Sequence, residues 1–320
     1  MRIIFMGTPD FAVGTLRALV ENGYDVVAVV TMPDKPKGRH GSVLQPSAVK
    51  QYALSAGIPV LQPEKLKDET FLAELASYRA DLQIVVAFRM LPEVVWAMPP
   101  LGTFNLHASL LPQYRGAAPI NWAIMNGETE TGVTTFFLQH DIDTGAIIRQ
   151  ERIPIGPDDD AESVHDRLMT LGAETTLRTV DDIIAGTIHP VAQSELVTPE
   201  TVLRPAPKLF KENTFIHWAQ PACDIHNFVR GLSPYPAAWT TFVTPEGTQI
   251  DAKIFQTRVE EGTLAVGTIE SDARSYLRIG TSSGIVSVLS LQIAGKRRMP
   301  VSDFLHGHPD ITLWHLSEHS

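Results

Sequence analysis

Cysteine is nearly missing from this sequence, which has one, Cys223, in 320 residues. Without a second thiol the chain forms no internal disulfide, and a zinc site built from cysteines is excluded. A lone cysteine is typical of a protein in a reducing compartment, where it usually serves as a small buried apolar residue. We therefore expect Cys223 to be buried and the chain to fold without covalent cross-links.

Long apolar runs are also missing. No segment approaches the ~18 apolar residues of a membrane-spanning helix. The first apolar run, RIIFM, is too short for a secretory signal. These absences predict a soluble, cytoplasmic protein. Its length suggests about two domains of ~150 residues, and a hydrophobic content of 44% is enough to form their cores.

Positive charge is scarce, because the net charge is -10. This argues at first against a nucleic-acid partner, whose phosphates require positive potential. All of the net charge lies in residues 1–203, however, whereas residues 204–320 are neutral. A nucleic-acid surface is therefore restricted to local basic patches, and a solvated surface is the alternative explanation for each. The two patches are Lys35, Lys37 and Arg39, and Lys296, Arg297 and Arg298.

Strands and helices alternate along the first half of the sequence. Residues 2–7 predict a fully apolar strand. The helix after it has Thr8 as its cap, Pro9 at its first position and Gly23 at its end. Residues 24–31 predict the next strand, and this order is typical of a doubly wound, mostly parallel α/β sheet. Later strands are expected near 59–61, 81–88, 102–107, 132–139 and 145–155, and helices at 46–56, 69–78, 92–98, 119–127 and 161–186.

A dinucleotide-binding fingerprint is missing as well. The first turn reads GTPDF, and Gly7 and Gly14 do not have the G-x-G-x-x-G spacing. The α/β pattern alone therefore does not predict a nicotinamide cofactor.

The second half has a different pattern. Residues 189–207 have no clear period and contain four prolines, which predicts a linker. We expect a catalytic domain at 1–188 and a small OB-like β-barrel at 208–320, because short alternating segments with glycine-containing turns follow the linker. In this second domain a helix is expected near 222–232, and strands at 237–243, 249–259, 264–271, 276–282 and 284–293.

Three polar residues form a candidate catalytic site. Asn105 and His107 lie two residues apart at the end of a predicted strand, so their side chains share one face. Asp143 follows in the motif HDIDTG, at another loop of the same sheet. Each residue alone also has a structural explanation: the Asn satisfies a turn, the His supports packing, and the Asp holds a tight turn. Loops at the carboxyl ends of parallel strands converge, which favours a shared site.

An amide, an imidazole and a carboxylate suit acyl transfer through a tetrahedral intermediate. A hydrogen-bond donor aimed at the developing oxyanion contributes about 3 kcal/mol. A positioned proton-transfer group contributes roughly a hundred- to ten-thousandfold in rate. No serine or cysteine is paired with His107, so we expect the nucleophile to come from the substrate. Zinc is the weaker alternative, because His140 and Asp141 add ligands without a metal-binding spacing.

The segments FNLHASLLPQYRGAAPINWAI and HDIDTG together resemble the folate-dependent formyltransferases, which share N-x-H, S-L-L-P and D-x-G motifs. Other segments, among them RIIFMGTPDFAVGTL, VVTMPDKPKGR and the stretch from residue 209 to 240, resemble the branch of this family that formylates initiator methionyl-tRNA for translation initiation. The resemblance runs from residue 2 to about residue 305.

The resemblance implies a formyl transfer from 10-formyltetrahydrofolate to the methionine amino group, without a metal. Asn105 and His107 would stabilise the oxyanion, while Asp143 would support His107 and help to move protons. The folate would lie against one loop and one strand end. These are Ser109, Leu110, Leu111 and Pro112, and Ala87, Phe88, Arg89, Met90 and Leu91.

The resemblance also implies a tRNA-binding mode. Residues 33–46 correspond to an inserted loop that enters the acceptor arm of the tRNA, with Arg39 at the key position. The barrel would hold tRNA along its basic side, and the protein would be a monomer. Two departures stand out: the sequence after Arg39, HGSVLQ, is poor in lysine, and Arg89 occupies a position where glycine is common.

Three other functions stay open at this level. They are a formyltransferase for a small substrate, such as a sugar nucleotide or glycinamide ribonucleotide, a hydrolase of formyltetrahydrofolate, and a non-catalytic RNA-binding module. A second domain after residue 208 favours the tRNA substrate over glycinamide ribonucleotide, and the acidic first half argues against the RNA-binding module.

Overall fold

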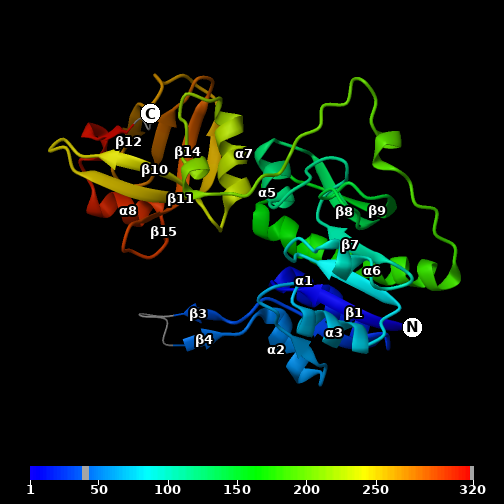
Figure 1. Cartoon of the computed structure of the whole chain (residues 1–320). Coiled ribbons are helices and arrows are strands. Elements are labelled where there is room, and N and C mark those ends of the chain that lie inside the picture. Colours follow the sequence, from blue (N-terminus) through cyan, green and yellow to red (C-terminus); the bar gives the residue numbers. More distant parts are fainter. Residues whose placement is uncertain (38–42, 318–320) are drawn as a thin grey trace. The chain divides into compact units, whose positions relative to one another are not determined.

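The chain divides into two units in the computed structural model, which describes residues 1–37 and 43–317 (Figure 1). The sheet unit comprises residues 1–116, 131–153 and 165–205. The barrel unit comprises residues 117–130, 154–164 and 206–320. Two short segments from the first half of the sequence therefore pack with the barrel. The domain boundaries at 188 and 208 stay predictions from the sequence.

The sheet unit is built on seven strands in the order β5-β2-β1-β6-β7-β8-β9. The strand β1 pairs in parallel with β2 and β6, β6 pairs in parallel with β7, and β8 is antiparallel to β7. The predicted doubly wound, mostly parallel α/β sheet is confirmed. Its strands are β1 (Arg2–Gly7), β2 (Asp25–Val30), β5 (Val60–Leu61), β6 (Leu82–Val86), β7 (Thr103–His107), β8 (Glu130–Phe137) and β9 (Ile147–Pro154).

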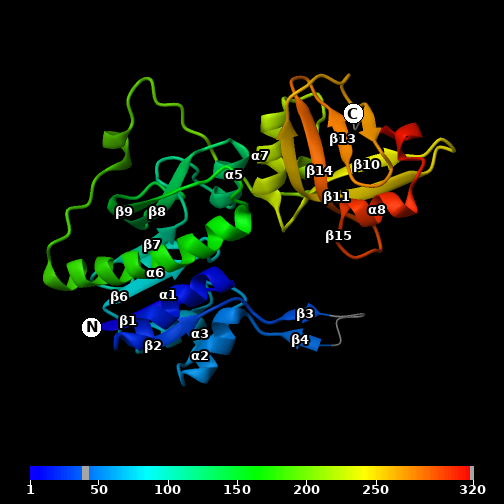
Figure 2. The same cartoon turned by 180° about the vertical axis from the view of Figure 1, so that it is seen from behind.

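Helices cover both faces of this sheet (Figures 1 and 2). On one face α1 and α6 pack closely. An ideal Cβ on Gly14 of α1 would lie 2.8 Å from Met169 Cγ of α6, and one on Gly172 of α6 would lie 2.7 Å from Leu106 Cδ2 of β7. The other face packs against α3 and α4. The helices are α1 (Asp10–Glu21), α2 (Ala48–Ser55), α3 (Glu69–Ser77), α4 (Glu93–Trp96) and α6 (Ala161–Ala185). Within the described ranges, no helix has both the length and the apolarity needed to cross a membrane.

The start of α1 differs from the prediction. Pro9, with φ of -80° and ψ of 175°, takes the cap position and the helix begins at Asp10, so Thr8 does not cap it. Pro9 is extended rather than helical, which moves the helix start past it. The predicted end is confirmed, because the Gly23 amide donates to Val20 O (3.1 Å) with a φ of 78°.

The expected loop at 33–46 contains a short hairpin. Strand β3 (Lys35–Lys37) pairs antiparallel with β4 (Val43–Gln45), and the hairpin projects away from the parallel sheet (Figure 1). Asp34 anchors its base by accepting hydrogen bonds from Lys50 Nζ and Gln62 Nε2, each 2.7 Å long. These two bonds lower the pKa of Asp34.

The barrel unit contains a curved antiparallel sheet in the order β12-β13-β14-β11-β10-β16, with β15 paired to β14. Phe242, Phe304 and Trp314 pack in its core. The predicted barrel-like second domain is confirmed. Its strands are β10 (Ala238–Val243), β11 (Gln249–Glu260), β12 (Ile269–Ser271), β13 (Leu277–Gly280), β14 (Ile285–Ile293), β15 (Met299–Pro300) and β16 (His315–Leu316). Its helices are α5 (Pro119–Met125), α7 (Ala222–Leu232) and α8 (Val301–Gly307).

Buried Arg230 on α7 joins the short segments to the barrel unit. Its Nη1 donates to Gly156 O (3.0 Å) and Asp159 O (2.8 Å), and its burial lowers the pKa of Arg230. On the other side of α7, Asn121 Nδ2 of α5 donates to Gly231 O at 2.8 Å. These bonds explain why residues 117–130 and 154–164 belong to this unit.

The expectation that Cys223 is buried was wrong, because its side chain is exposed on α7. The apolar face of the amphipathic α7 is supplied by Ala222, Ile225, Val229 and Leu232, which join the barrel core. Cys223 lies off this face and contributes nothing to the core.

Leu106 on β7 provides a test of this packing, since it is 2% exposed and lies against α6. We expect Leu106→Ala to lower the free energy of unfolding by about 2–5 kcal/mol, because a cavity forms where the side chain was removed. Leu54→Ala on α2, where the side chain is 60% exposed, is the matched control and should change it by less than about 0.5 kcal/mol. Urea denaturation followed by circular dichroism measures both; equal midpoints would contradict the packing described.

Candidate active site

The strand β7 carries two polar side chains on one face, as predicted. Phe104 and Leu106 point to the face that α1 and α6 cover and are fully buried. The two-residue period of a strand therefore turns Asn105 and His107 to the other face. Asn105 stands in register with Val85 of β6, near the carboxyl ends of the parallel strands, where ligands bind in sheets of this type.

His107 lies between two acceptor groups. It is 7% exposed, and its Nε2 is 2.9 Å from Tyr114 O. Because a carbonyl oxygen accepts only, Nε2 carries a proton, and Nδ1 faces Asp143 Oδ2 at 3.9 Å. This second distance is too long for a direct hydrogen bond and suits a bridging water.

Asp143 is held by the backbone of the loop that follows β7. The Gly116 amide donates to Asp143 Oδ2 at 3.0 Å, the same oxygen that faces His107. Asp143 and Tyr114 both have left-handed backbones, with φ of 54° and 58°. Such conformations are costly for residues with a Cβ and gather at functional sites. The structure thus brings His107 and Asp143 together from distant parts of the chain.

Asn105 completes the group with an unsatisfied amide. Its Oδ1 is buried and has no hydrogen-bond partner in the described part of the chain. Buried polar atoms of this kind are rare, and each calls for a partner. Turning the amide about its last bond brings Nδ2 to the same place, where it would donate to a ligand oxygen.

Glycine is required just after Asp143. An ideal Cβ on Gly145 would lie 1.6 Å from Phe137 O, so any side chain there would displace the backbone. The D-x-G motif therefore combines the carboxylate of Asp143 with a close approach of two backbone segments.

Hydrogen bonds hold the loop from Ser109 to Pro112 in place. The Ser109 hydroxyl donates to Gln113 O (2.7 Å), and Ser109 O accepts from Thr134 Oγ1 (2.6 Å). Gln150 Nε2 donates to Leu111 O at 2.6 Å. Ser109, Leu111 and Pro112 are buried and Leu110 is half-buried. The loop thus has a rigid shape, and the assignment of these four residues to a folate site stays a prediction.

Arg89 has a structural role. Its Nη1 donates to Glu64 O (2.8 Å), and its Nη2 donates to Pro63 O. Its guanidinium carbon lies 5.7 Å from the centre of the Phe88 ring. Desolvation of the guanidinium lowers the pKa of Arg89. Arg89, whose role was open from the sequence, therefore holds the chain segment that follows β5.

The other residues predicted to line the folate site differ in exposure. Ala87 is exposed and left-handed, with φ of 48°. Met90 is 74% exposed, whereas Leu91 is buried and Phe88 packs half-buried against the sheet core. Ala87 and Met90 are thus accessible to a ligand, and Leu91 and Phe88 shape the segment that carries them.

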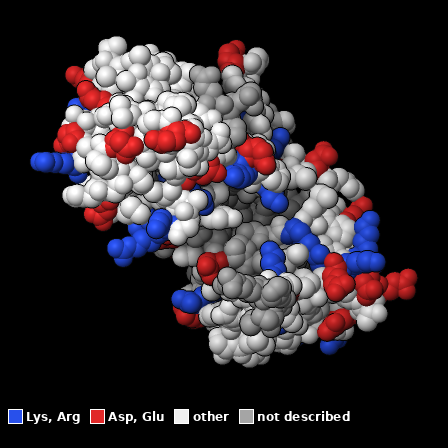
Figure 3. Space-filling model, turned by 90° about the vertical axis from the view of Figure 1, so that its left-hand side faces the viewer, with Lys and Arg blue, Asp and Glu red and all other residues white. Residues whose placement is uncertain are grey.

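The first basic patch lies on the hairpin. Lys35 is exposed on β3, Lys37 is the last residue of that strand, and Arg39 lies outside the described residues. On the face shown in Figure 3, basic and acidic groups alternate among the described residues. Any binding of phosphates there depends on local groups, as the sequence predicted.

The second basic patch lies between β14 and β15. Lys296 and Arg297 are exposed. Arg298 is tethered, because its Nε donates to Ser290 Oγ (3.0 Å) and its guanidinium carbon lies 4.5 Å from the centre of the Phe255 ring. The patch therefore has two exposed cations and a third, Arg298, whose guanidinium is held by a hydrogen bond and an aromatic ring.

Gln193 is a site residue that the sequence did not reveal. It is 3% exposed in the short 3-10 helix η2 (Gln193–Leu196). Its Nε2 donates to Asp143 O (2.8 Å) and Gly145 O (2.9 Å), and its Oε1 accepts from Arg115 Nη2 (2.6 Å). It is the only glutamine of the proline-rich segment assigned to a linker, and no motif or period in that segment marks it.

Metal ligands do not gather anywhere in residues 1–37 and 43–317, where no three His, Cys, Asp or Glu side chains come together. His140, the additional zinc candidate, lies 3.7 Å from Glu93 on the surface. The absence of a metal stays a prediction.

Both halves of the chain match one family. Residues 1–180 match the formyl transferase family, and residues 208–309 match the formyl transferase C-terminal domain. The chain belongs to the formyl transferase family. A methionyl-tRNA formyltransferase from Parabacteroides distasonis is 62% identical over 313 residues, covering 97% of each chain. One from Bacteroides thetaiotaomicron is 59% identical over 309 residues, 96% of this chain and 95% of the other. The resemblance to the tRNA-formylating branch is confirmed.

Solved structures share the fold of this family member. HypX from Aquifex aeolicus, in complex with tetrahydrofolic acid, has a TM-score of 0.63 at 20% identity, covering 96% of this chain and 47% of HypX. The sugar 3N-formyl transferase WlaRD, solved with dTDP and 5-N-formyl-THF, has a TM-score of 0.64 at 20% identity, covering 93% and 99%. At these identities the likeness extends to the fold alone.

The clamp made by Gln193 predicts a measurable change in the active-site loop. We expect Gln193→Ala to raise the exchange rate of the Gly116 amide, which donates to Asp143 Oδ2, by roughly tenfold, because two hydrogen bonds that hold Asp143 are lost. Hydrogen exchange followed by NMR measures this rate.

Two controls separate the clamp from a general loosening. Gln193→Glu keeps an acceptor for Arg115 but loses both N–H donors, so it should loosen the same amide. Gln51→Ala removes an exposed amide that donates to Pro46 O and should leave the rate unchanged. An unchanged Gly116 amide in both Gln193 variants would show that the clamp is dispensable.

Proposed function

We infer that the chain transfers a formyl group from 10-formyltetrahydrofolate to the methionine amino group of initiator methionyl-tRNA. One observation carries this inference: His107 and Asp143 face each other on the sheet face where the buried Oδ1 of Asn105 has no hydrogen-bond partner among the described residues, in a chain 62% identical to a methionyl-tRNA formyltransferase. This constellation suits acyl transfer without a covalent enzyme intermediate.

The reaction requires a group that stabilises negative charge. The folate supplies an activated formyl group: its carbon gains a bond to the amine nitrogen and loses its bond to the folate nitrogen, and its oxygen carries the charge in between. Asn105 fits the charge-stabilising role when its amide is turned, because Nδ2 then takes the buried place of Oδ1, which has no partner in the described ranges, and donates to the oxyanion. A donor placed there contributes about 3 kcal/mol to transition-state stabilisation.

The reaction also requires a proton carrier, because the attacking amine loses one proton and the folate nitrogen gains one. His107 Nδ1 and Asp143 Oδ2 are 3.9 Å apart, so a single water between them completes a path for that proton. Tyr114 O and the Gly116 amide fix the two ends of this path. His107 thereby keeps a defined orientation during turnover.

The donor would lie against the rigid loop and the accessible strand end. In this proposal the contacts come from Leu110 and the loop backbone, because the Ser109 hydroxyl already donates within the loop. Exposed Ala87 and Met90 would form the other wall. Solved relatives of the fold carry tetrahydrofolic acid or 5-N-formyl-THF in their structures, which supports a folate for this chain.

The acceptor would be held by the two basic patches. The exposed Lys35 on the hairpin and the exposed Lys296 and Arg297 of the barrel unit suit phosphate contacts. We propose a monomer that works in the cytoplasm, where charged tRNA and folate occur, and that needs no metal.

One assay tests the function directly. The protein is incubated with 10-formyltetrahydrofolate and charged initiator tRNA, with uncharged tRNA, water alone and amino-sugar nucleotides as alternative acceptors. Formylated methionyl-tRNA as the preferred product supports the proposal. A preference for the sugar nucleotide, or release of formate without an acceptor, would instead establish a small-substrate formyltransferase or a hydrolase. Binding of tRNA without any transfer would establish an RNA-binding module.

The three candidate catalytic residues should be separable from the fold. We expect Asn105→Ala, His107→Ala and Asp143→Ala each to lower kcat at least a hundredfold, because each removes charge stabilisation or proton transfer. Circular dichroism and thermal melts check that the fold persists. His140→Ala, at an exposed position, is the control. Near-normal turnover in all three variants would reject the assignment.

The hairpin should contribute to tRNA binding and not to folate binding. We expect Lys35→Ala to raise the KM for methionyl-tRNA and to lower the slope of log K against log salt by about 0.7–0.9, the value for one lost phosphate contact. The KM for folate should stay the same. Lys67→Ala, also exposed, is the matched control; an equal effect of both variants would mean that only total charge matters.

A further inference from the structure

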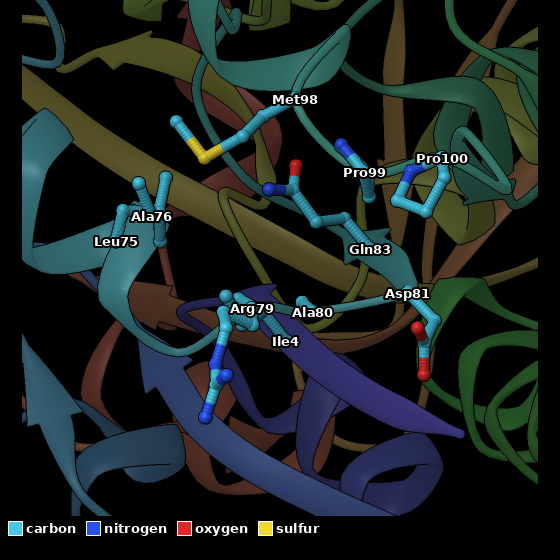
Figure 4. A pocket seen from close by; sticks show the side chains of 10 residues that line it. All are labelled: Ile4, Leu75, Ala76, Arg79, Ala80, Asp81, Gln83, Met98, Pro99 and Pro100. Atoms are coloured by element: carbon cyan, nitrogen blue, oxygen red, sulfur yellow. The ribbon is translucent and has the colours of Figure 1, made fainter.

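A pocket opens at the amino ends of the sheet strands, away from the carboxyl ends that carry the candidate active site. Its volume is about 320 Å³. Its floor is Ile4 of β1 and Gln83 of β6, and its walls come from the end of α3 and from the turn after α4 (Figure 4). Pockets that hold small molecules start at about 300 Å³. No step of the proposed reaction uses this one.

The floor of the pocket contains a buried amide that lacks a partner. Gln83 is 0% exposed, and its Nε2 has no hydrogen-bond partner among the described residues. The Thr103 hydroxyl lies 2.7 Å from Trp96 O and 3.1 Å from Gln83 Oε1, so its one proton is shared between these two acceptors and it faces the oxygen end of the amide. Figure 4 shows the amide nitrogen pointing into the space between Met98 and the end of α3.

This polar residue is an exception within its strand. The other positions of β6 are apolar and buried, and an unpaired amide in such a place destabilises the folded state. A buried donor without a partner is a reason to look for a ligand, an ordered water or another compensating group. The adjacent space exceeds the ~30 Å³ share of one water several times over.

Most of the other lining residues have apolar side chains. Leu75, Ala76, Met98, Pro99 and Pro100 supply the walls. The charged groups turn away: in Figure 4 the guanidinium of Arg79 and the carboxylate of Asp81 both point outward.

The Asp81 carboxylate is also engaged elsewhere, because its Oδ2 accepts from the backbone amide of Arg2 at 2.6 Å. The pocket thus combines several apolar side chains with the neutral amide of Gln83, and no charged side-chain end points into it among the described residues.

We propose that this pocket binds a small, neutral, largely apolar molecule with a carbonyl oxygen, which accepts a hydrogen bond from Gln83 Nε2. Apolar walls with a few placed polar groups are the usual composition of small-molecule sites. The site is separate from the one at Asn105 and His107, because Val85, Leu91 and Val95 of the sheet core pack on this face beyond Gln83. The proposal does not depend on the identity of the formyl acceptor.

Acetophenone and α-methylstyrene form a matched pair of probes, because they have the same shape and differ by a carbonyl oxygen against a methylene. The full-length protein, labelled with 13C in its methionine methyl groups, is titrated with each probe, and the Met98 methyl resonance reports occupancy. We expect acetophenone to saturate the Met98 shift and α-methylstyrene to bind roughly fivefold more weakly, the difference made by one neutral hydrogen bond. Benzoate should bind no more tightly than acetophenone.

Variants locate the effect in the pocket. Gln83→Met keeps the length of the side chain without the amide, so acetophenone should weaken to the level of α-methylstyrene while α-methylstyrene is unchanged. Ala76→Phe should abolish binding of both probes, because Ala76 is an exposed lining residue of α3. Ala73→Phe, one turn earlier on the same helix, exposed and outside the lining, should leave binding unchanged. Ala76→Phe keeps the test valid if Gln83→Met fails to fold.

Several results would overturn the proposal. They are the absence of a saturable Met98 shift at millimolar acetophenone, equal affinity for the two probes, and binding that survives Ala76→Phe. Tighter binding of aniline, a donor, than of acetophenone would show that the amide presents its oxygen. A crystal structure in which an ordered water stays on Gln83 Nε2 after soaking with acetophenone would make the pocket a hydration site only.

Discussion

The two-residue period of β7 is the constraint on which the site depends. It turns Phe104 and Leu106 toward the helices α1 and α6 and leaves Asn105 and His107 on the opposite face. A slip of one residue would turn the amide and the imidazole toward α1 and α6 and would place the two large apolar side chains on the face of the site. The close packing of Leu106 against Gly172 prevents this slip. Packing on one face of the strand thereby fixes the chemistry on the other.

Patterns that follow from the periods of regular structure could be predicted from the sequence. The alternation of strands and helices predicted the parallel sheet, and the spacing of Asn105 and His107 predicted that their side chains share one face. The D-x-G motif gave Asp143, because a loop of the same sheet carries it. Each of these inferences needs only local geometry and the rule that strand ends converge.

Contacts that depend on the assembled fold could not be predicted. Gln193 becomes a clamp only when a segment fifty residues along the chain reaches the Asp143 loop. Arg89 suggested a charge at a ligand site, but it meets the carbonyls of Pro63 and Glu64 once β5 and β6 lie in one sheet. Cys223 was expected inside because of its residue type, whereas its position on α7 turns it outward. The predicted cap of α1 was wrong for a local reason: the backbone of Pro9 is extended, so the helix begins after it.

Arg230 has a consequence for any attempt to study the barrel by itself. Its guanidinium is buried, and its acceptors Gly156 O and Asp159 O come from a segment about seventy residues earlier in the sequence. A fragment that starts at residue 208 would contain the cation and its acceptor Asn227 Oδ1 but neither backbone oxygen, and a buried charge that loses acceptors opposes folding. Such a fragment would fold only with an uncharged residue in place of Arg230 or with the missing peptide added in trans.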